Sequence, residues 1–215
     1  MYVLLGIVST PDSTSHVQPT IDSIPVEILC KIFSDAIKSP WSQFGPSYLS
    51  PHRRNLDLLK LTAVCRRWRS TASGCAMLWA DISFSTSDWT TIECATLFLG
   101  RSKQAMLSVH IWDSVNPRSD PGITRSCKEL IRAIAGQSHR FSTCDLSSPS
   151  PRFWSHWSSP APNLRKLTVR GYGGKFSPIF HGQAPRLESI TSFYHAPWPL
   201  GNYITLMRAD LRNHG

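Results

Sequence analysis

The sequence has 215 residues, and its 41% hydrophobic content is enough for a folded core in one or two domains. The formal net charge is +9, but the basic residues are spread along the chain, whereas a nucleic-acid site usually shows clustered charge with interleaved aromatic residues. The six cysteines contain no C-x-x-C pair and indicate a reducing, intracellular compartment, cytoplasmic or nuclear. The apolar run at residues 3–8 is too short to cross a membrane.

A helical region is predicted after a leader that is rich in Ser, Thr and Pro. We expect residues 1–21 to be flexible. Pro25 suits the first turn of a helix, where its missing N–H would have had no partner, and Glu27 lies near the positive end of the helix dipole. A single apolar face at three- and four-residue steps is then formed by Ile24, Ile28, Leu29, Ile32, Phe33 and Ala36.

A polar insertion separates this helix from a second apolar stripe. Residues 39–56 contain three prolines, and we expect them to loop out. Thr62 is the expected N-cap of the next helix. The second stripe consists of Leu61, Val64, Cys65, Trp68 and Ala72. A unit of about 50 residues cannot bury two such faces completely, so some apolar surface should bind a partner. An ordinary helical hairpin with every stripe in its core is the alternative.

The strings in this region carry a family resemblance. The segment I-P-x-E-I-L-x-x-I-F, followed by L-L-x-L-x-x-V-C-R-R-W-R-x-x-A and then L-W, resembles an F-box, as found in fungal-type F-box substrate receptors. The departures are Ile24, where Leu is usual, and the insertion. The resemblance implies that residues 22–80 bind a Skp-type adaptor and, through it, the cullin and RING subunits of an SCF-type ubiquitin ligase. We assign adaptor contact to Ile24, Pro25, Ile28, Leu29, Ile32, Leu61, Val64, Cys65 and Trp68.

Strands and helices alternate after residue 80. Period-two alternation predicts strands at residues 80–84 and 107–111. Helical spacing predicts helices at residues 89–99, closed by Gly100, and at residues 127–135.

A template of apolar positions then recurs. Its first positions are Phe141, Leu164, Leu187 and Leu206, and each is followed by template positions three and five residues later. This spacing resembles the leucine-rich repeat, in which each unit supplies one strand to a parallel sheet. Cys144, Ser192 and Ala209 stand where a leucine is usual. We therefore predict an α+β protein: a helical F-box module at residues 22–80, then an α/β leucine-rich-repeat-like solenoid at residues 81–215. We expect the solenoid to be incomplete at its C-terminus, since no capping helix follows residue 211.

No catalytic, cofactor or metal site is predicted. Residues 171–176 lack the Ser or Thr of a phosphate-binding loop and favour a turn, and the histidines lack metal-ligand spacing. Six aromatic residues either anchor a bound protein or fill the space between repeats: Phe153, Trp154, Trp157, Phe193, Tyr194 and Trp198. The resemblance implies a non-catalytic receptor that binds a protein substrate through its repeats. The alternatives are an adaptor-binding scaffold outside a ligase and a basic repeat protein that binds RNA or DNA.

Overall fold

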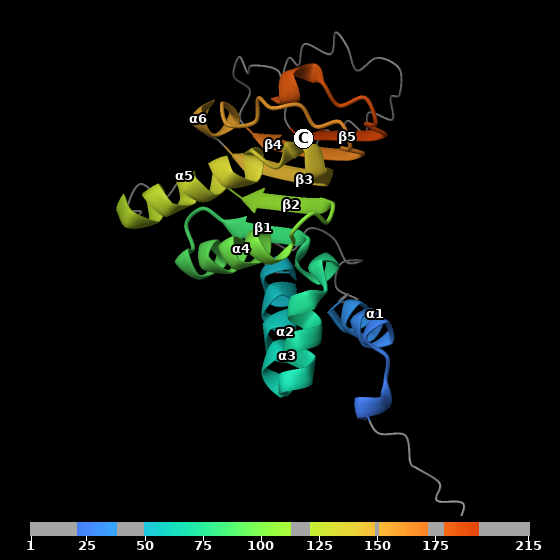
Figure 1. Ribbon diagram of the computed structural model, residues 1–215. Helices are drawn as coiled ribbons and strands as arrows, with labels where there is room; N and C mark the ends of the chain where they lie inside the picture. Colours follow the sequence, from blue (N-terminus) through green and yellow to red (C-terminus); the bar gives the residue numbers. More distant parts are fainter. Residues whose placement is uncertain (1–20, 38–49, 113–120, 149–150, 172–178, 194–215) are drawn as a thin grey trace, which may run out of the picture.

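The computed structural model describes residues 21–37, 50–112, 121–148, 151–171 and 179–193 (Figure 1). Its first part is helical and comprises η1 (Ile21–Ser23), α1 (Val26–Ile37), α2 (Ser50–Val64), α3 (Arg66–Gly74) and η3 (Ala76–Trp79). Strands with intervening helices follow: β1 (Asp81–Ser85), α4 (Trp89–Arg101), β2 (Leu107–Trp112), α5 (Pro121–Ala135), η4 (Ser138–Arg140), β3 (Phe141–Ser148), α6 (Pro151–Trp154), β4 (Lys166–Gly171), η5 (Ile179–Gly182) and β5 (Ser189–Phe193). The predicted leader, the template at residues 206–211 and the predicted incomplete end lie outside the described residues.

Helix α1 confirms the first predicted helix, but its apolar residues occupy two sides. Leu29, Phe33 and Ile37 are buried at four-residue steps and hold α1 against the rest of the protein. Ile28 and Ile32, which the spacing placed on the same face as Leu29, are exposed. One side of the helix therefore belongs to the core, and a neighbouring side remains apolar and in contact with water.

Two boundaries in the helical part differ from the prediction. The inserted loop was predicted to reach residue 56, but α2 already begins at Ser50, because a proline such as Pro51 is tolerated in the first turn of a helix. Residues 39–49 of that loop lie outside the described residues. The predicted N-cap at Thr62 is also wrong, since its Oγ1 donates to the Leu59 carbonyl within α2 at 2.7 Å. Cys65 is the N-cap of α3, and its Sγ accepts from the Trp68 N–H at 3.4 Å.

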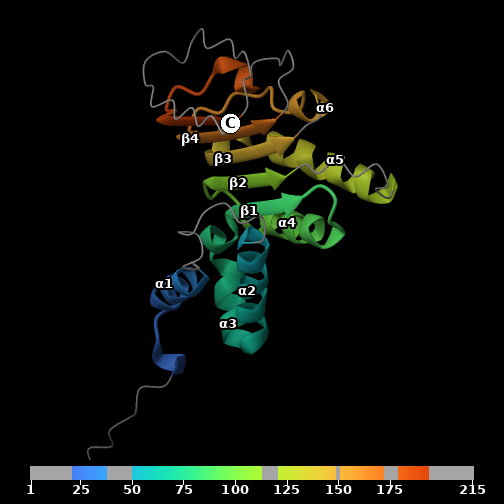
Figure 2. The ribbon, with the colours of Figure 1, turned by 180° about the vertical axis from the view of Figure 1, so that it is seen from behind.

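The five strands form one parallel sheet in chain order, β1-β2-β3-β4-β5 (Figures 1 and 2). The strands and helices predicted between residues 80 and 135 are present, although β1 begins at Asp81 and α4 runs through Gly100 to end at Arg101. One face of the sheet is apolar, and its central row consists of Ile82, Val109, Cys144, Leu167 and Ile190 in register. The three template segments within the described residues thus place their second positions side by side on β3, β4 and β5.

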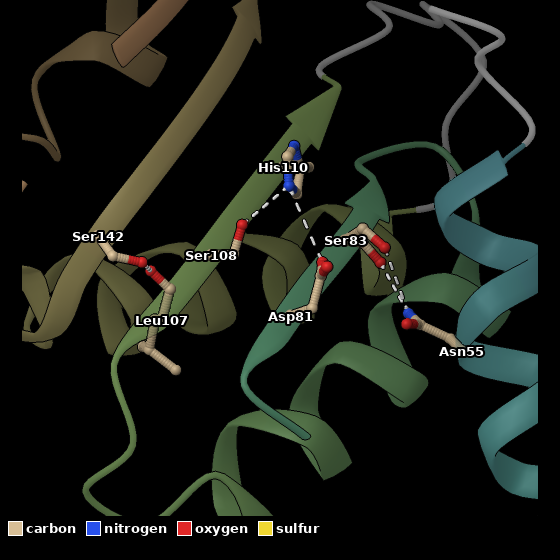
Figure 3. A network of polar contacts seen from close by, with 7 residues as sticks. All are labelled: Asn55, Asp81, Ser83, Leu107, Ser108, His110 and Ser142. Carbon is tan, nitrogen blue, oxygen red and sulfur yellow. Dashed lines mark hydrogen bonds and ion pairs between the residues drawn. The ribbon is translucent and has the colours of Figure 1, made fainter. Parts of the chain in front are cut away.

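The helical part and the sheet share one hydrophobic core. The indole of Trp79 donates to the Ala72 carbonyl at 2.7 Å, and its ring contacts Phe98 of α4 at a centroid distance of 4.9 Å. At the free edge of β1, the side-chain amide of Asn55 donates to the backbone oxygen of Ser83 at 3.3 Å (Figure 3). These contacts tie α3 through η3 to α4, and α2 to the first strand, while the division into separate domains at residue 80 stays a prediction.

Three of the six aromatic residues singled out in the second half fill the core. Phe153, Trp154 and Trp157 are at most 5% exposed, so their interpretation as anchors for a bound protein is wrong. Trp157 packs against Phe141 and Phe180, where these rings occupy volume that leucines would fill in a regular repeat. The side chain of Phe193 and residues 194 and 198 lie outside what the structure describes. None of the described helices has the length and apolar character needed to cross a membrane.

Candidate functional site

The helical part exposes large apolar side chains to water. Six of them are 45–76% exposed: Ile21, Val26, Ile28, Ile32, Val64 and Met77. Ile28 and Ile32 lie one turn apart on α1, and we call this pair the apolar α1 face. Exposed apolar side chains gathered on one small region of a protein mark an interaction site more often than scattered ones do. The apolar α1 face is therefore a candidate docking surface for another protein.

The nine residues assigned to adaptor contact divide by burial. Leu29 is 1% exposed and belongs to the core, because it lies on the side of α1 that packs inward, so it is not available for direct contact. Ile24, Leu61 and Trp68 are half-buried and pack against the core. The five exposed members are Pro25, Ile28, Ile32, Val64 and Cys65. Direct contact by the eight residues other than Leu29 stays a prediction.

Arg67 brings two parts of this set together. Its guanidinium donates to the backbone carbonyls of Ile21 and Ile24, so the start of α1 lies within reach of one side chain from the start of α3. The ring of Trp68 contacts Phe33 at a centroid distance of 4.9 Å, which fixes α1 against α3. The structure thus brings Ile24 and Pro25, which precede α1, to the beginning of α3. Val64 and Cys65 come directly before α3 in the chain.

Sequence reasoning missed the organising role of Arg67 and the exposure of Ile21, Val26 and Met77. Arg67 lies outside both apolar stripes, and its hydrogen bonds to backbone carbonyls far away in the chain leave no pattern in the sequence. Val26 lies at the first turn of α1, where few neighbours cover it. Met77 lies in η3 and is 76% exposed.

The second face of the sheet is polar, and its part on β2 to β5 forms a second candidate surface, since Ser83 on β1 is buried. Its central row, in register across all five strands, consists of Ser83, His110, Asp145, Thr168 and Thr191. The Nε2 atom of His110 lies 3.1 Å from the Ser108 hydroxyl and 3.9 Å from an Asp81 carboxylate oxygen (Figure 3). A face of this composition can form many directional hydrogen bonds with a bound chain.

An ion pair stands at the middle of this polar face. Arg170 lies 3.2 Å from the carboxylate of Asp145, and both side chains are less than 20% exposed. Burial raises the pKa of Asp145 above its ordinary value, while the nearby Arg170 acts in the opposite direction. Among the residues that the structure describes, no cluster of three or more His, Cys, Asp and Glu side chains could hold a metal ion.

Comparison with known proteins assigns a domain to the helical part of the chain. A family model described as F-box-like matches residues 21–85, which span the helical part and β1. Searches of curated proteins and of solved structures gave no match. The helical elements that carry the apolar α1 face, together with the first strand on which α2 rests, thus form an F-box-like domain.

Proposed function

We propose that this protein is the non-catalytic substrate-recognition subunit of an SCF-type ubiquitin ligase. The F-box-like domain would bind a Skp-type adaptor, and the sheet would bind a protein substrate. The observation that carries the proposal is the F-box-like match at residues 21–85 together with the apolar side chains that this domain exposes. F-box domains generally bind such adaptors, and apolar side chains that remain in water provide the driving force for it.

Adaptor contact would centre on the exposed members of the predicted set. Removing Ile28 and Ile32 from water on binding would supply part of the affinity, because burial of apolar area is the main favourable term in association. Pro25, Val64 and Cys65 would contact the adaptor at the α1–α3 corner that Arg67 holds in place. Leu29 and Phe33 would contribute indirectly, because their burial in the core holds α1 in position.

The substrate would bind to a leucine-rich-repeat-like domain. Supporting this interpretation, the first positions Phe141, Leu164 and Leu187 are each at most 8% exposed, and the strands that follow them pair in parallel order. Stacked units of this kind bury their apolar positions only against neighbouring units. The polar face of the sheet, with His110, Asp145 and Arg170, would then be available to select a protein segment.

Such a receptor performs no chemistry of its own. It would raise the local concentration of a substrate lysine near the ubiquitin thioester that the rest of the assembly carries. Catalysis would come from proximity, so the geometry between the two surfaces matters more than any single reactive group. The joint core around Trp79 and the bond from Asn55 to Ser83 would keep that geometry fixed.

The test is co-purification with a purified Skp-type adaptor. Changing Pro25 and Ile28 together to Asp should abolish binding, because it places two charges on the proposed contact surface. Both side chains are exposed, so the fold should stay intact. The matched control is Leu97→Asp on α4, which is 37% exposed and lies outside the F-box-like domain. Adaptor binding by the double variant at the level of the unchanged chain would contradict the proposal.

A cullin pull-down with a ubiquitination assay then separates a ligase receptor from a scaffold. A receptor should recruit cullin through the adaptor and support ubiquitin transfer to a bound protein, whereas a scaffold would bind the adaptor alone. Binding to RNA or DNA would instead weaken steeply as salt rises. Against it, several exposed basic side chains are paired with carboxylates, including Lys31 with Asp35 at 2.9 Å and Arg125 with Glu129 at 3.1 Å.

A further inference from the structure

The segments that precede strands β3 to β5 lie side by side at one edge of the sheet. Because the strands are parallel and follow one another in chain order, their amino ends share this edge. The side-chain amide of Asn163, just before β4, donates to the backbone carbonyl of His139, just before β3, at 2.8 Å. Arg186, just before β5, donates to the side-chain oxygen of Asn163 at 3.0 Å. These hydrogen bonds join three consecutive segments.

Further hydrogen bonds extend this row to the start of β2. The hydroxyl of Ser142 donates to the carbonyl of Leu107 at 3.0 Å. The backbone N–H of Arg165 donates to the carbonyl of Ser142 at 2.9 Å, and the N–H of Glu188 donates to the carbonyl of Arg165 at 2.8 Å. Residues that are far apart in the chain thus occupy neighbouring places, so charges that are scattered in the sequence meet at this edge.

Basic side chains gather where these segments meet. The group consists of Lys103, Arg140, Arg165, Lys166 and Arg186, and we call it the basic edge. All of its members except Arg140 are exposed. Lys166 is the first residue of β4 and lies two residues before Thr168, so it is on the polar face of the sheet. The basic edge therefore borders that polar face.

Arg140 places a cation beneath the edge. It is 5% exposed, and its guanidinium donates to the Ser102 hydroxyl at 2.9 Å, the Ala105 carbonyl at 2.9 Å and the Gln137 side chain at 3.3 Å. A buried cation is usually paired with a carboxylate, but these partners are all uncharged. The same bonds fix the turn that carries Lys103, whose φ of 46° is a conformation that glycine adopts more easily. One exposed charge is therefore held in place above a buried one.

Carboxylates are scarce at this edge. Residues 102–108, 136–143, 160–168 and 181–189 contain one acidic residue, Glu188, which lies 3.4 Å from Arg165. Both side chains of this pair are more than half exposed, so their attraction is weak in water. At β1 the edge is bounded by Asp81, which lies 3.9 Å from His110. Within the part of the chain that the structure describes, the remaining members of the basic edge have no carboxylate partner.

We propose that the basic edge binds an acidic segment of another protein. Carboxylates of Asp or Glu side chains would accept charge-assisted hydrogen bonds from the Lys and Arg side chains along the strand ends. Met106, which is 44% exposed just before β2, would contact an apolar side chain of the same segment. That this segment belongs to a ligase substrate rests on the proposed function, but the binding itself needs no adaptor.

The edge suits an acidic polypeptide better than a nucleic acid. Sites for single-stranded nucleic acid stack the bases on exposed aromatic side chains. Among residues 102–108, 136–143, 160–168 and 181–189, Phe141 is the one Phe, Tyr or Trp, and it is buried. The exposed apolar side chain here is Met106, which suits a side chain of a polypeptide. Charge and composition together therefore favour an acidic protein segment.

Fluorescence anisotropy with the full chain tests this proposal. The probes are a labelled oligoglutamate peptide and a labelled single-stranded DNA of equal charge. No adaptor is present, so failure of the proposal is distinct from failure of the proposed function. We expect the peptide to bind and its affinity to fall as salt rises, because the contacts are exposed to solvent.

Two double variants with equal changes of charge show where the peptide binds. Arg165→Glu/Arg186→Glu should weaken peptide binding about tenfold or more, because it replaces attraction by repulsion at the edge. The matched control is Arg125→Glu/Lys128→Glu, which changes two exposed basic residues in the first part of α5. This control should change the affinity by less than about twofold.

A milder variant covers the case in which charge reversal disturbs the fold. Arg165→Gln/Arg186→Gln removes both charges without adding new ones and should still weaken binding about threefold or more. Absence of peptide binding, or equal weakening by the edge and α5 variants, would overturn the proposal. Tighter binding of the DNA than of the peptide, with loss in the edge variants, would overturn the assignment of an acidic protein segment.

Discussion

The apolar α1 face allows a quantitative prediction for the double variant Ile28→Ala/Ile32→Ala. Full burial of an Ile side chain is worth about 1.5–3 kcal/mol. Ile28 is 53% exposed and Ile32 is 45% exposed, so about half of that amount remains to be gained from each on binding. The pair should therefore contribute about 1.5–3 kcal/mol, which corresponds to a roughly ten- to hundredfold loss of adaptor affinity.

Isothermal titration of a purified Skp-type adaptor into each variant measures this loss. Leu97→Ala serves as the control, since Leu97 is a partly exposed apolar residue on α4, outside the F-box-like domain. The free energy of unfolding of the double variant should change little, because both side chains face water in the free protein. Unchanged adaptor affinity in a folded double variant would refute the assignment of this face.

Three other outcomes follow from buried or half-buried groups. Leu29→Ala should lower the free energy of unfolding by about 2–5 kcal/mol in urea titration, since it opens a cavity beneath α1; a change below 0.5 kcal/mol would contradict its place in the core. Asn55→Ala should lower it by about 1–3 kcal/mol, because Ser83 loses its bonds to α2; an unchanged value would argue against this joint. Burial lowers the pKa of His156, and the charges of Arg132 and Lys128 lower it further. As the pH falls below 6.5, His156 therefore takes up a proton more readily in the unfolded chain than in the folded protein, and the free energy of unfolding should fall. In His156→Gln, the unfolding midpoint should depend less on pH below 6.5 than in the unchanged chain. An equal pH dependence in both proteins would contradict this role of His156.

Much of the helical domain could be predicted, because its signals are local. The period of apolar residues in α1 and the proline at its start depend on neighbouring residues only. The break at Cys65 could not be predicted in this way, since Leu61, Val64 and Trp68 continue one helical period across two separate helices. Similarly, periodicity could not predict that Leu29 is buried and Ile28 is exposed. The elements that pack against α1 decide which of its two adjacent apolar sides is covered.

The sheet shows the same limit at longer range. Alternation predicted β1 and β2, and the template spacing predicted that Cys144, Leu167 and Ile190 would occupy equivalent places. The polar face could not be predicted as a surface, because it exists only when strands far apart in sequence pair in register. The aromatic residues of 153–157 were ambiguous in the sequence, and only the three-dimensional packing showed that they fill the core.

The exposed thiol of Cys65 gives the most direct test of the docking surface. Labelling of the full chain by a maleimide, resolved by peptide mass spectrometry, reports the reaction rate of Cys65 with and without the adaptor. Cys94, half-buried on α4, provides the internal control. We expect the adaptor to slow labelling of Cys65 at least tenfold and to leave labelling of Cys94 unchanged. Equal labelling of Cys65 in the free protein and at saturating adaptor would contradict it.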